Sequence, residues 1–446
     1  MKTIIIGGVA AGMTSAAKLK RLDPKHIIHV YEKGTDLSYS GCGMPYFLGD
    51  IVTDESKLIA RYQSDFKKQG IDVFLSHEVT KVNPKSKQVT VLNLKTGVTF
   101  VDSYDYLVIG TGTTANKTNV LGSKQAHIYV LNQLPDMRHI KPEVVSGRQV
   151  AIIGGGYIGV EVAENLIHQG LVVHIIQRGN QLLSVYDYDV AKKARVELEN
   201  MGVLVHLEEK LQAYETSGDQ IVVITDKQTF TVDFVIESIG VRPNTMFLQD
   251  TGLKMLKNGA ILINSFCETS LPSIYAAGDC AAYYHQITKD YVYVPLGTHA
   301  NKTGRIVAEN IAGLKTAFPG IVGSNIIKVG HLAFAKTGLG IDQALQLNLD
   351  YAYVDVTAKH QTSYYPGATD LFMRIVYEKK TGVLKGAQLV GEKGVSDRIN
   401  IMALAITKSL TASEFSQLDF AYAPPFSPVW DPLLVAANQI KASIGE

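Results

Sequence analysis

The sequence predicts an α/β protein with two dinucleotide-binding, Rossmann-like units and a C-terminal region of a different, α+β character. Two observations carry this prediction. A strand, a glycine-rich turn, a helix and a second strand follow one another at the N-terminus, and the same order recurs from residue 149. From about residue 326, strands rich in valine and tyrosine alternate with one helix, expected near 397–409, without a glycine fingerprint.

The first unit is predicted at the start of the chain, with a strand, a helix and a strand at 3–6, 10–22 and 27–32. Its turn keeps the first and last glycines of the dinucleotide fingerprint, Gly7 and Gly12, while Val9 replaces the middle one. The N–H groups of such a turn can approach a pyrophosphate, and the following helix N-terminus favours its negative charge. Glu32 ends the second strand, where a carboxylate accepts a hydrogen bond from a ribose hydroxyl. The alternative is a glycine-rich turn beside a surface glutamate.

The second unit carries a complete fingerprint. Its strand, helix and strand are predicted at 149–153, 157–169 and 171–176. Gly154, Gly156 and Gly159 occupy all three glycine positions. The second strand ends at Gln177, followed by Arg178; a carboxylate there would repel a 2′-phosphate, whereas an arginine can pair with it. The sequence therefore favours NADPH without excluding NADH, unless Arg178 is a solvated surface cation.

Further segments complete the predicted organisation. Short alternating strands are expected at 88–104, a helix at 189–201, and buried strands at 106–110, 234–239 and 274–279. The proline-dense run at 422–428 is incompatible with a helix or a central strand.

Composition excludes several classes of protein. The 446 residues carry 43 basic and 42 acidic side chains, and no basic stripe indicates a nucleic-acid partner. No apolar run is long enough for a membrane span. Three cysteines at irregular spacing make neither a disulfide framework nor a metal site, and they favour a reducing, cytoplasmic setting. We therefore expect no nucleic acid, no membrane and no metal.

Cys42 is the candidate reactive residue, because Cys267 and Cys280 lie far downstream and are interpreted as ordinary buried cysteines. Three explanations compete for it: a buried structural thiol, one half of a redox pair, or a lone redox thiol. The flanking Gly41 and Gly43 favour an open segment, and no second cysteine lies nearby. A lone thiol beside two nucleotide sites predicts a flavoprotein that passes electrons from a nicotinamide to sulfur.

These motifs resemble those of the single-cysteine flavoproteins among the pyridine nucleotide-disulfide oxidoreductases, over essentially the whole chain. The resemblance implies an FAD domain split by an NAD(P)H domain and followed by a C-terminal dimerisation domain, with parts at 1–112, 113–244, 245–325 and 326–446. It also implies that Asp279 binds the ribityl chain of the flavin. The expected cofactor-binding residues are Gly7, Val9, Gly12, Glu32, Lys33, Thr111, Gly112, Gly154, Gly156, Tyr157, Gly159, Gln177, Arg178, Gly240, Gly278 and Asp279.

Within this family the chain is most similar to the coenzyme A-disulfide reductase branch, through the runs at 364–367, 391–394 and 421–425. The oxidase and peroxidase branch carries a histidine in its first glycine turn, and this chain has none there. The resemblance implies a homodimer in which Tyr364 and Tyr422 of one subunit approach Cys42 of the other. It further implies coenzyme A contacts at Thr14, Arg21 and Ser38.

Three positions depart from the coenzyme A branch. Gly41 stands where asparagine is common, Trp430 where a lysine meets coenzyme A, and Asn301 near an expected histidine. Losing a cation where a phosphate should lie removes charge-assisted contacts. The electron acceptor is therefore left open between coenzyme A disulfide, another small disulfide, a persulfide and oxygen.

The predicted activity is an FAD-dependent NAD(P)H:disulfide oxidoreductase in which Cys42 forms a mixed disulfide with the substrate. One alternative is an NADH oxidase that reduces oxygen through a sulfenic acid at Cys42. An alternative of another class is an electron-carrier flavoprotein that docks a protein partner and does not use the thiol.

Overall fold

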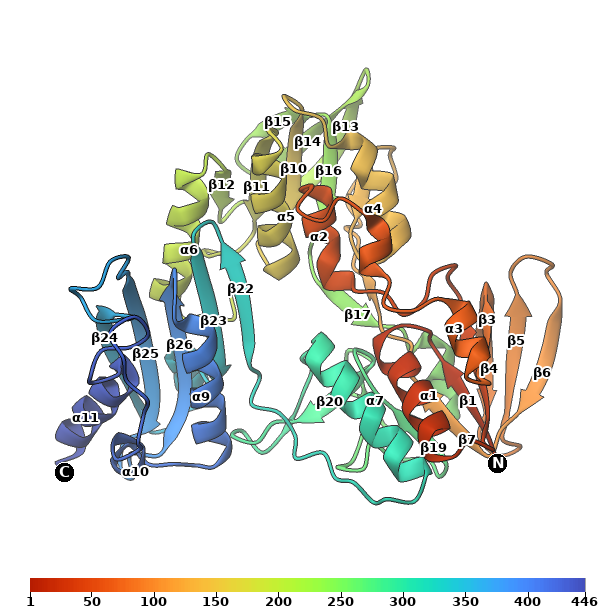
Figure 1. Ribbon diagram of the computed structural model, residues 1–446. Helices are drawn as coiled ribbons and strands as arrows, with labels where there is room; N and C mark the ends of the chain where they lie inside the picture. Colours follow the sequence, from red (N-terminus) through yellow and green to blue (C-terminus); the bar gives the residue numbers. More distant parts are fainter. Residues whose placement is uncertain (446) are drawn as a thin grey trace.

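Three five-stranded sheets organise the chain, which a computed structural model describes over residues 1–445 (Figure 1). Two sheets are parallel and form dinucleotide-binding units, and the third is antiparallel and lies in the C-terminal part. Figure 1 shows three lobes, with the second dinucleotide unit above the other two. The predicted fold class is confirmed.

The first parallel sheet has the strand order β19-β7-β1-β2-β3. Its strands are β1 Lys2–Ile6, β2 Ile27–Glu32, β3 Asp72–Leu75, β7 Tyr106–Ile109 and β19 Ile274–Ala276. Helix α1, Ala10–Leu22, has the predicted ends and packs against α7, Gly297–Ile311. The expected alternating strands belong to a separate antiparallel sheet of β4 His77–Asn83, β5 Gln88–Asn93 and β6 Thr99–Ser103.

The chain leaves the first sheet after β7 and returns to its edge with β19. The two strands pair in parallel, with Ile274 opposite Leu107. Between them the chain crosses to the second unit through β8, Thr113–Ala115, and comes back through β17, Val241–Pro243. Strands β8 and β17 pair antiparallel, so the outgoing and returning segments lie side by side. The second unit is thus inserted into the first, while the predicted residue boundaries remain a prediction.

The second sheet is also parallel and five-stranded, with the strand order β12-β11-β10-β16-β9. Its strands are β9 Ile128–Val130, β10 Gln149–Ile153, β11 Val172–Gln177, β12 Leu204–Leu207 and β16 Phe234–Glu237. Its helices are α4 Leu134–Ile140, α5 Tyr157–His168 and α6 Tyr188–Asn200. An antiparallel sheet of β13 Leu211–Ser217, β14 Gln220–Thr225 and β15 Thr229–Val232 flanks it.

Several short elements lie outside the two parallel sheets. They are α2 Met44–Leu48, α3 Gln63–Lys68, β18 Ile261–Leu262, β20 Ala281–Tyr284 and β21 Tyr291–Val292. Short 3₁₀ turns occur at Gly41–Gly43, Glu55–Leu58, Lys141–Glu143 and Met246–Thr251. Helix α2 packs against α5, which brings the segment after β2 against the second unit. Within residues 1–445 no helix combines the length and the apolar character needed to cross a bilayer.

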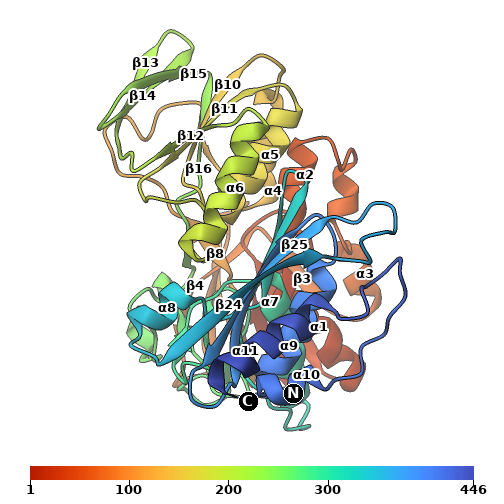
Figure 2. The same ribbon diagram turned by 90° about the vertical axis from the view of Figure 1, so that its left-hand side faces the viewer.

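The C-terminal sheet has the order β22-β23-β26-β25-β24. Its strands are β22 Asn325–Val329, β23 Leu332–Gly338, β24 Tyr351–Lys359, β25 Asp370–Glu378 and β26 Leu384–Gly391. The expectation of one helix was wrong, because α8 Ile341–Gln346, α10 Ala412–Ser416 and α11 Pro432–Ile444 accompany α9 Val395–Thr407. Helices α9 and α11 run along this sheet (Figure 2). The proline-dense run before α11 is neither helix nor strand, as predicted.

One buried ion pair links Asp431, which follows the proline-dense run, to Arg398 on α9 beside the C-terminal sheet. Arg398 on α9 donates to Asp431 at 2.7 Å and to the carbonyl of His360 at 2.9 Å. Both charged side chains are almost fully buried, so removing either would leave an unpaired charge in the interior. The loop after β24 is tied to the same run, since Thr362 N–H donates to the Pro424 carbonyl at 3.3 Å. The pair therefore holds together the two segments that carry Tyr364 and Tyr422.

Candidate active site

The first glycine turn is built by close backbone approach. Gly7 has φ +106°, and a Cβ there would lie 2.2 Å from the Gly110 carbonyl oxygen. A Cβ on Gly12 would lie 1.9 Å from the Gly7 carbonyl oxygen. No larger residue fits either position without moving the backbone, so α1 begins directly against the end of β1. Val9 precedes that helix without a side-chain cap, which leaves its N-terminal N–H groups free for an anion.

Glu32, at the end of β2, is hydrogen-bonded to this turn. Its carboxylate accepts hydrogen bonds from the N–H groups of Gly8 and Gly34, each at 2.6 Å. Burial raises the pKa of Glu32, and the two backbone donors oppose that shift. The Glu32 carboxylate thus holds the turn through two backbone N–H groups, and its contact with a ribose stays a prediction. Lys33, next to it, is exposed and pairs with Glu78 at 2.8 Å.

Asp279 carries an unsatisfied buried oxygen at the end of the first sheet. Its Oδ1 atom is buried and has no hydrogen-bond partner within the described chain, and burial raises the pKa of its carboxyl group to about 6. A buried polar atom without a partner requires an explanation, and a hydroxyl donor from a bound ligand would supply one. A Cβ on the preceding Gly278 would lie 2.9 Å from the Ala11 side chain, so this acid adjoins the start of α1.

The second glycine turn reproduces the first. Gly154 has φ +109°, and a Cβ on Gly159 would lie 2.1 Å from the Gly154 carbonyl oxygen. Gln177 Oε1 accepts from the Gly155 N–H at 3.2 Å, which is the counterpart of the bond between Glu32 and Gly8. Space is open around Gly156. The fingerprint therefore forms two similar cradles, and the second replaces the acid by a neutral amide.

Other predicted cofactor residues lie at the edges of these cradles. Arg178 directly follows β11 and is exposed, and it forms no ion pair with any part of the chain between residues 1 and 445. Tyr157 is the first residue of α5. Gly112 and Gly240 flank the crossing strands, and their carbonyls accept from backbone N–H groups at 3.0 and 2.9 Å. Thr111 accepts through its carbonyl from the Asn244 side chain at 3.0 Å.

Cys42 is the exposed thiol among three free cysteines. It lies in the 3₁₀ turn Gly41–Gly43, immediately before α2. Cys267 and Cys280 are fully buried, as expected, and the Cys280 thiol donates to the Ile109 and Ala277 carbonyls. A substrate disulfide could therefore reach one sulfur of this protomer without unfolding it.

The protomer's own charges do not activate this thiol. Desolvation by the surrounding protein raises the pKa of the Cys42 thiol, and the carboxylates of Glu161 and Asp279 raise it further. Glu161 lies on α5, and burial together with Glu164 raises its own pKa to about 7. The sequence reasoning missed Glu161, because its approach to the thiol depends on the packing of α2 against α5.

Tyr364 and Tyr422 lie together, but away from Cys42 of the same chain. The hydroxyl of Tyr422 is the main cause of the raised pKa of Tyr364. The two side chains are 73% and 45% exposed, and Phe426 and Trp430 nearby in sequence are also exposed. Figure 1 shows β24 in a different lobe from α2.

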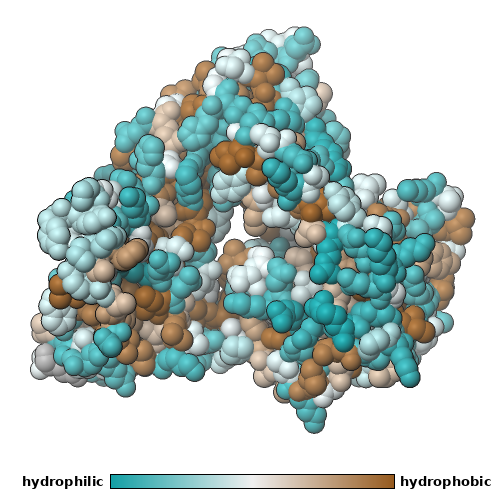
Figure 3. Space-filling view, viewed as in Figure 1, coloured by the Kyte–Doolittle hydropathy of each residue, from teal (hydrophilic) through white to brown (hydrophobic). Residues whose placement is uncertain are grey.

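The predicted substrate residues lie on and beside α1. Thr14 donates to the side chain of Asn301 on α7 at 2.9 Å, so two positions considered separately in the sequence are in contact. Arg21 is exposed in the last turn of α1. Ser38 donates its N–H to the Gly8 carbonyl at 2.8 Å. Figure 3 shows that the face between the three lobes is hollowed. Nowhere in residues 1–445 do three metal-ligating side chains gather.

Sequence comparison finds relatives over nearly the whole chain. Residues 1–304 match the pyridine nucleotide-disulphide oxidoreductase family, and residues 325–432 match the dimerisation domain of that family. A coenzyme A disulfide reductase from Staphylococcus aureus is 34% identical over 430 residues, which is 96% of each chain.

Solved structures share the fold over 100% of this chain. Reduced CoADR-RHD of Bacillus anthracis has a TM-score of 0.96 at 32% identity, with 80% of its chain covered. An NAD-dependent persulfide reductase from A. fulgidus has 0.96 at 31% identity, with 84% covered. A water-forming NADH oxidase from Lactobacillus brevis, bound to NADH, has 0.97 at 26% identity, with 99% covered. Its engineered NADPH-bound mutant gives the same values, and two of its five substitutions introduce arginine.

We predict that Glu161→Gln makes the Cys42 thiol more acidic. The carboxylate raises the thiol pKa, so its removal should increase the thiolate fraction at a given pH. The difference should appear above pH 7 and vanish below it, because Glu161 itself protonates at about 7. The measurement is the rate of Cys42 alkylation by iodoacetamide against pH. Glu197→Gln, on α6, is the control and should leave the profile unchanged, and an identical profile for Glu161→Gln would contradict the argument.

Proposed function

Because the chain belongs to the pyridine nucleotide-disulphide oxidoreductase family, we propose that it is an NAD(P)H-dependent disulfide reductase that works through the single thiol of Cys42. The observation that carries the proposal is the position of this thiol. It is the exposed one of three cysteines, and it lies directly before α2, which packs against α5 of the second unit. A sulfur at the meeting point of two dinucleotide units is placed to receive electrons.

The enzyme uses FAD and NAD(P)H. The residues present fit FAD in the first cradle: α1 begins at this turn without a side-chain cap, so its first N–H groups can bind a pyrophosphate, and the unpartnered Oδ1 of Asp279 can accept from a hydroxyl donor. When bound, FAD supplies two-electron transfer from the nicotinamide to a neighbouring sulfur. In the second cradle, Gly154–Gly159 would hold the nicotinamide nucleotide, with Arg178 at the position of a 2′-phosphate.

The thiol step is an exchange. The Cys42 thiolate attacks one sulfur of the substrate disulfide, a bond forms between these two sulfurs, and the other half leaves as a thiolate that takes up a proton. Two electrons then cleave the mixed disulfide, releasing the second thiol and restoring the Cys42 thiolate. Since desolvation, Glu161 and Asp279 raise the pKa of the thiol, the thiolate needs a further stabilising group, which the bound flavin or a hydroxyl pair from a second subunit would supply.

Coenzyme A disulfide is the substrate that the relatives favour. Thr14, Arg21 and Ser38 lie on and beside α1, where they would contact it, and Arg21 offers an exposed cation for a phosphate. Trp430, in place of the expected lysine, is exposed and offers an aromatic surface instead of a charge. A related small disulfide or a persulfide would use the same thiol, and the persulfide reductase neighbour supports testing one.

The working unit would be a homodimer. Residues 325–432 match a dimerisation domain, and Tyr364, Tyr422, Phe426 and Trp430 expose aromatic surface near the proline-dense run. Exposed apolar surface of this kind marks protein–protein contacts. We propose that it covers the Cys42 region of the other subunit, so that the two tyrosine hydroxyls reach the thiol.

A steady-state screen tests the activity. We expect oxidation of NADPH or NADH to depend on added coenzyme A disulfide or another small disulfide, and Cys42→Ser to abolish it. Cys267→Ser is the matched control and should retain turnover, because Cys267 is buried away from solvent. Oxygen as the preferred acceptor would point to the oxidase alternative, whereas full turnover of Cys42→Ser would point to a thiol-independent electron carrier.

We predict that Arg178→Ala weakens NADPH binding more than NADH binding. Arg178 is the exposed cation that follows β11, and a charge-assisted contact to the 2′-phosphate should contribute about tenfold or more in affinity. The measurement is the KM for each nucleotide. Arg195→Ala removes another exposed arginine of the same lobe, paired with Glu199, and should change neither value. An equal rise in KM for both nucleotides in Arg178→Ala would show that this residue does not contact the 2′-phosphate.

Subunit mixing tests the shared site. If Tyr422 reaches the partner's thiol, a heterodimer of Cys42→Ser and Tyr422→Phe chains has one pocket with both lesions and one intact pocket. Random exchange should then restore about a quarter of the wild-type sites, because half of the dimers are mixed. Turnover of the mixture is compared with that of each homodimer. Absence of recovery, with exchange demonstrated by mass, would place both residues in one subunit's pocket.

A further inference from the structure

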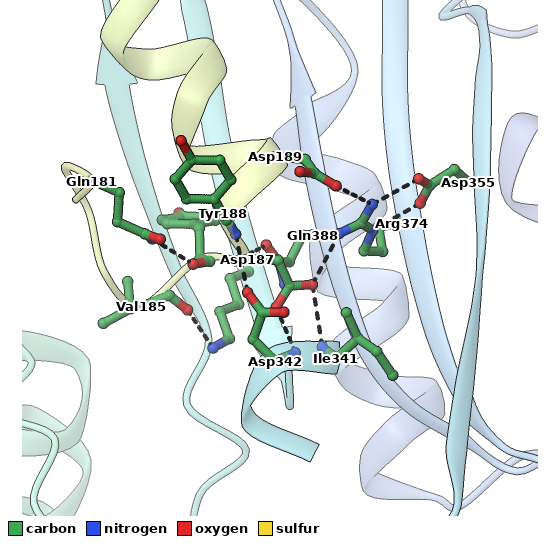
Figure 4. Close-up of polar contacts among 12 residues, drawn as sticks. Gln181, Val185, Asp187, Tyr188, Asp189, Ile341, Asp342, Asp355, Arg374 and Gln388 are labelled. Atoms are coloured by element: carbon green, nitrogen blue, oxygen red, sulfur yellow. Dashed lines mark hydrogen bonds and ion pairs between the residues drawn. The ribbon is translucent and has the colours of Figure 1, made fainter. Parts of the chain in front are cut away.

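Residues 181–187, here called the junction segment, connect β11 to α6 and lie between the second glycine turn and the C-terminal domain. Figure 4 shows the polar contacts on the C-terminal side, where side chains of the second unit meet those of β25, β26 and α8. The segment therefore touches, within a few residues, the turn proposed to hold NAD(P)H and the domain that carries the dimerisation match.

The junction segment packs against the second glycine turn. The Leu183 N–H donates to the Gly155 carbonyl at 2.7 Å. A Cβ on Gly155 would lie 2.3 Å from the Leu182 side chain, so the two backbones are as close as the side chain allows. Leu183 has φ +45°, a left-handed conformation that a leucine adopts only when its surroundings impose it. The position of the turn and the position of this segment are thus interdependent.

On the other side, the segment ends in a reciprocal cap between two helices of different domains. Asp187 is the N-cap residue of α6, yet its side chain makes no bond to its own helix. Its carboxylate instead accepts from the N–H groups of Ile341 and Asp342 at the start of α8, each at 3.2 Å. In return, Asp342 accepts from the Tyr188 N–H of α6 at 3.1 Å. Each helix therefore has its free N–H groups satisfied by an acid of the other domain.

Buried charge reinforces this contact. Arg374 on β25 contacts Asp187 at 3.4 Å, and both side chains are nearly inaccessible to solvent. The Asp187 N–H donates to Gln388 on β26 at 3.0 Å, and Lys336 on β23 donates to the Val185 carbonyl at 2.5 Å. Arg374 is also paired with Asp355 at 2.8 Å, so it stays compensated if the link to Asp187 is lost. Losing the Asp187 carboxylate would then loosen the junction segment, which keeps its backbone bonds to Gln388 and Lys336, without leaving the arginine unpaired.

We propose that Asp187 is a positioning residue for NAD(P)H: through it, the C-terminal domain holds the junction segment against Gly155 and keeps the second glycine turn in its binding geometry. The inference rests on the proposed assignment of Gly154–Gly159 to the nicotinamide nucleotide. Its consequence is that the affinity for NAD(P)H depends on a domain that carries no dinucleotide fingerprint. Cys42 lies in the 3₁₀ turn before α2, outside the junction segment, so the proposal concerns the affinity for the nucleotide and not the thiol exchange.

The test uses anaerobic stopped-flow reduction of the flavin in the intact holoenzyme, with the nucleotide that reduces the wild type. For Asp187→Asn we expect the Kd for that nucleotide to rise about two- to thirtyfold, while the limiting rate and the KM for the disulfide stay unchanged. Asp189→Asn is the matched control. Asp189 is an acid two residues on that also contacts Arg374, but it is 70% exposed and does not contact α8, so its Kd should equal that of the wild type.

A second variant covers the case in which Asp187→Asn does not fold. Gly340→Ala keeps every charge but would place a methyl group 2.2 Å from Asp187 Oδ1, and it should raise the same Kd. An unchanged Kd in a folded variant overturns the inference. So does a parallel loss of flavin, dimer mass and disulfide KM, because that pattern marks a merely structural role. A wild-type flavin that neither NADPH nor NADH reduces would contradict the proposed function itself.

Discussion

The return of the chain to its first sheet is the constraint on which the rest of the structure depends. Strand β19 completes that sheet beside β7 after the second unit has been inserted. The turn after β19 then carries Asp279 to the start of α1, where Gly7 and Gly12 allow the close backbone approach that forms the glycine turn. Because the outgoing and returning strands β8 and β17 pair with each other, the second unit is held close to the thiol before α2.

The electrostatics of the thiol support the proposal that a second subunit completes the site. Desolvation and two carboxylates raise the Cys42 pKa, which disfavours the nucleophilic form. The hydroxyl pair of Tyr364 and Tyr422 is formed but exposed in another lobe. A dimer that brings these two hydroxyls to the partner's thiol would stabilise both groups, because the hydroxyls gain a hydrogen-bond acceptor and the thiolate gains donors. Nucleotide binding and thiol chemistry would thus both rely on the C-terminal domain, by different surfaces.

Sequence patterns predicted the parts whose causes are local. The ends of α1 and β2 follow from a strand, a glycine turn and an apolar helix face, and the structure confirms them. Helix α11 was not predicted, although Asp431 and Pro432 mark its start, because the proline-dense run just before it disfavours a helix. Glu161 and Asp187 could not be found from sequence. Their surroundings are created by α2 on α5 and by α8 on α6, contacts between segments far apart in the chain.

The central claim is that Cys42 exchanges thiol groups with a small disulfide. The most direct measurement is the intact mass of each subunit after treatment with coenzyme A disulfide without NAD(P)H, followed by peptide mapping. The account predicts one coenzyme A thiol per subunit, bound at Cys42 and removed by adding NAD(P)H. An adduct at Cys267 or Cys280 instead, or no adduct under conditions in which the enzyme turns over this disulfide, would contradict it.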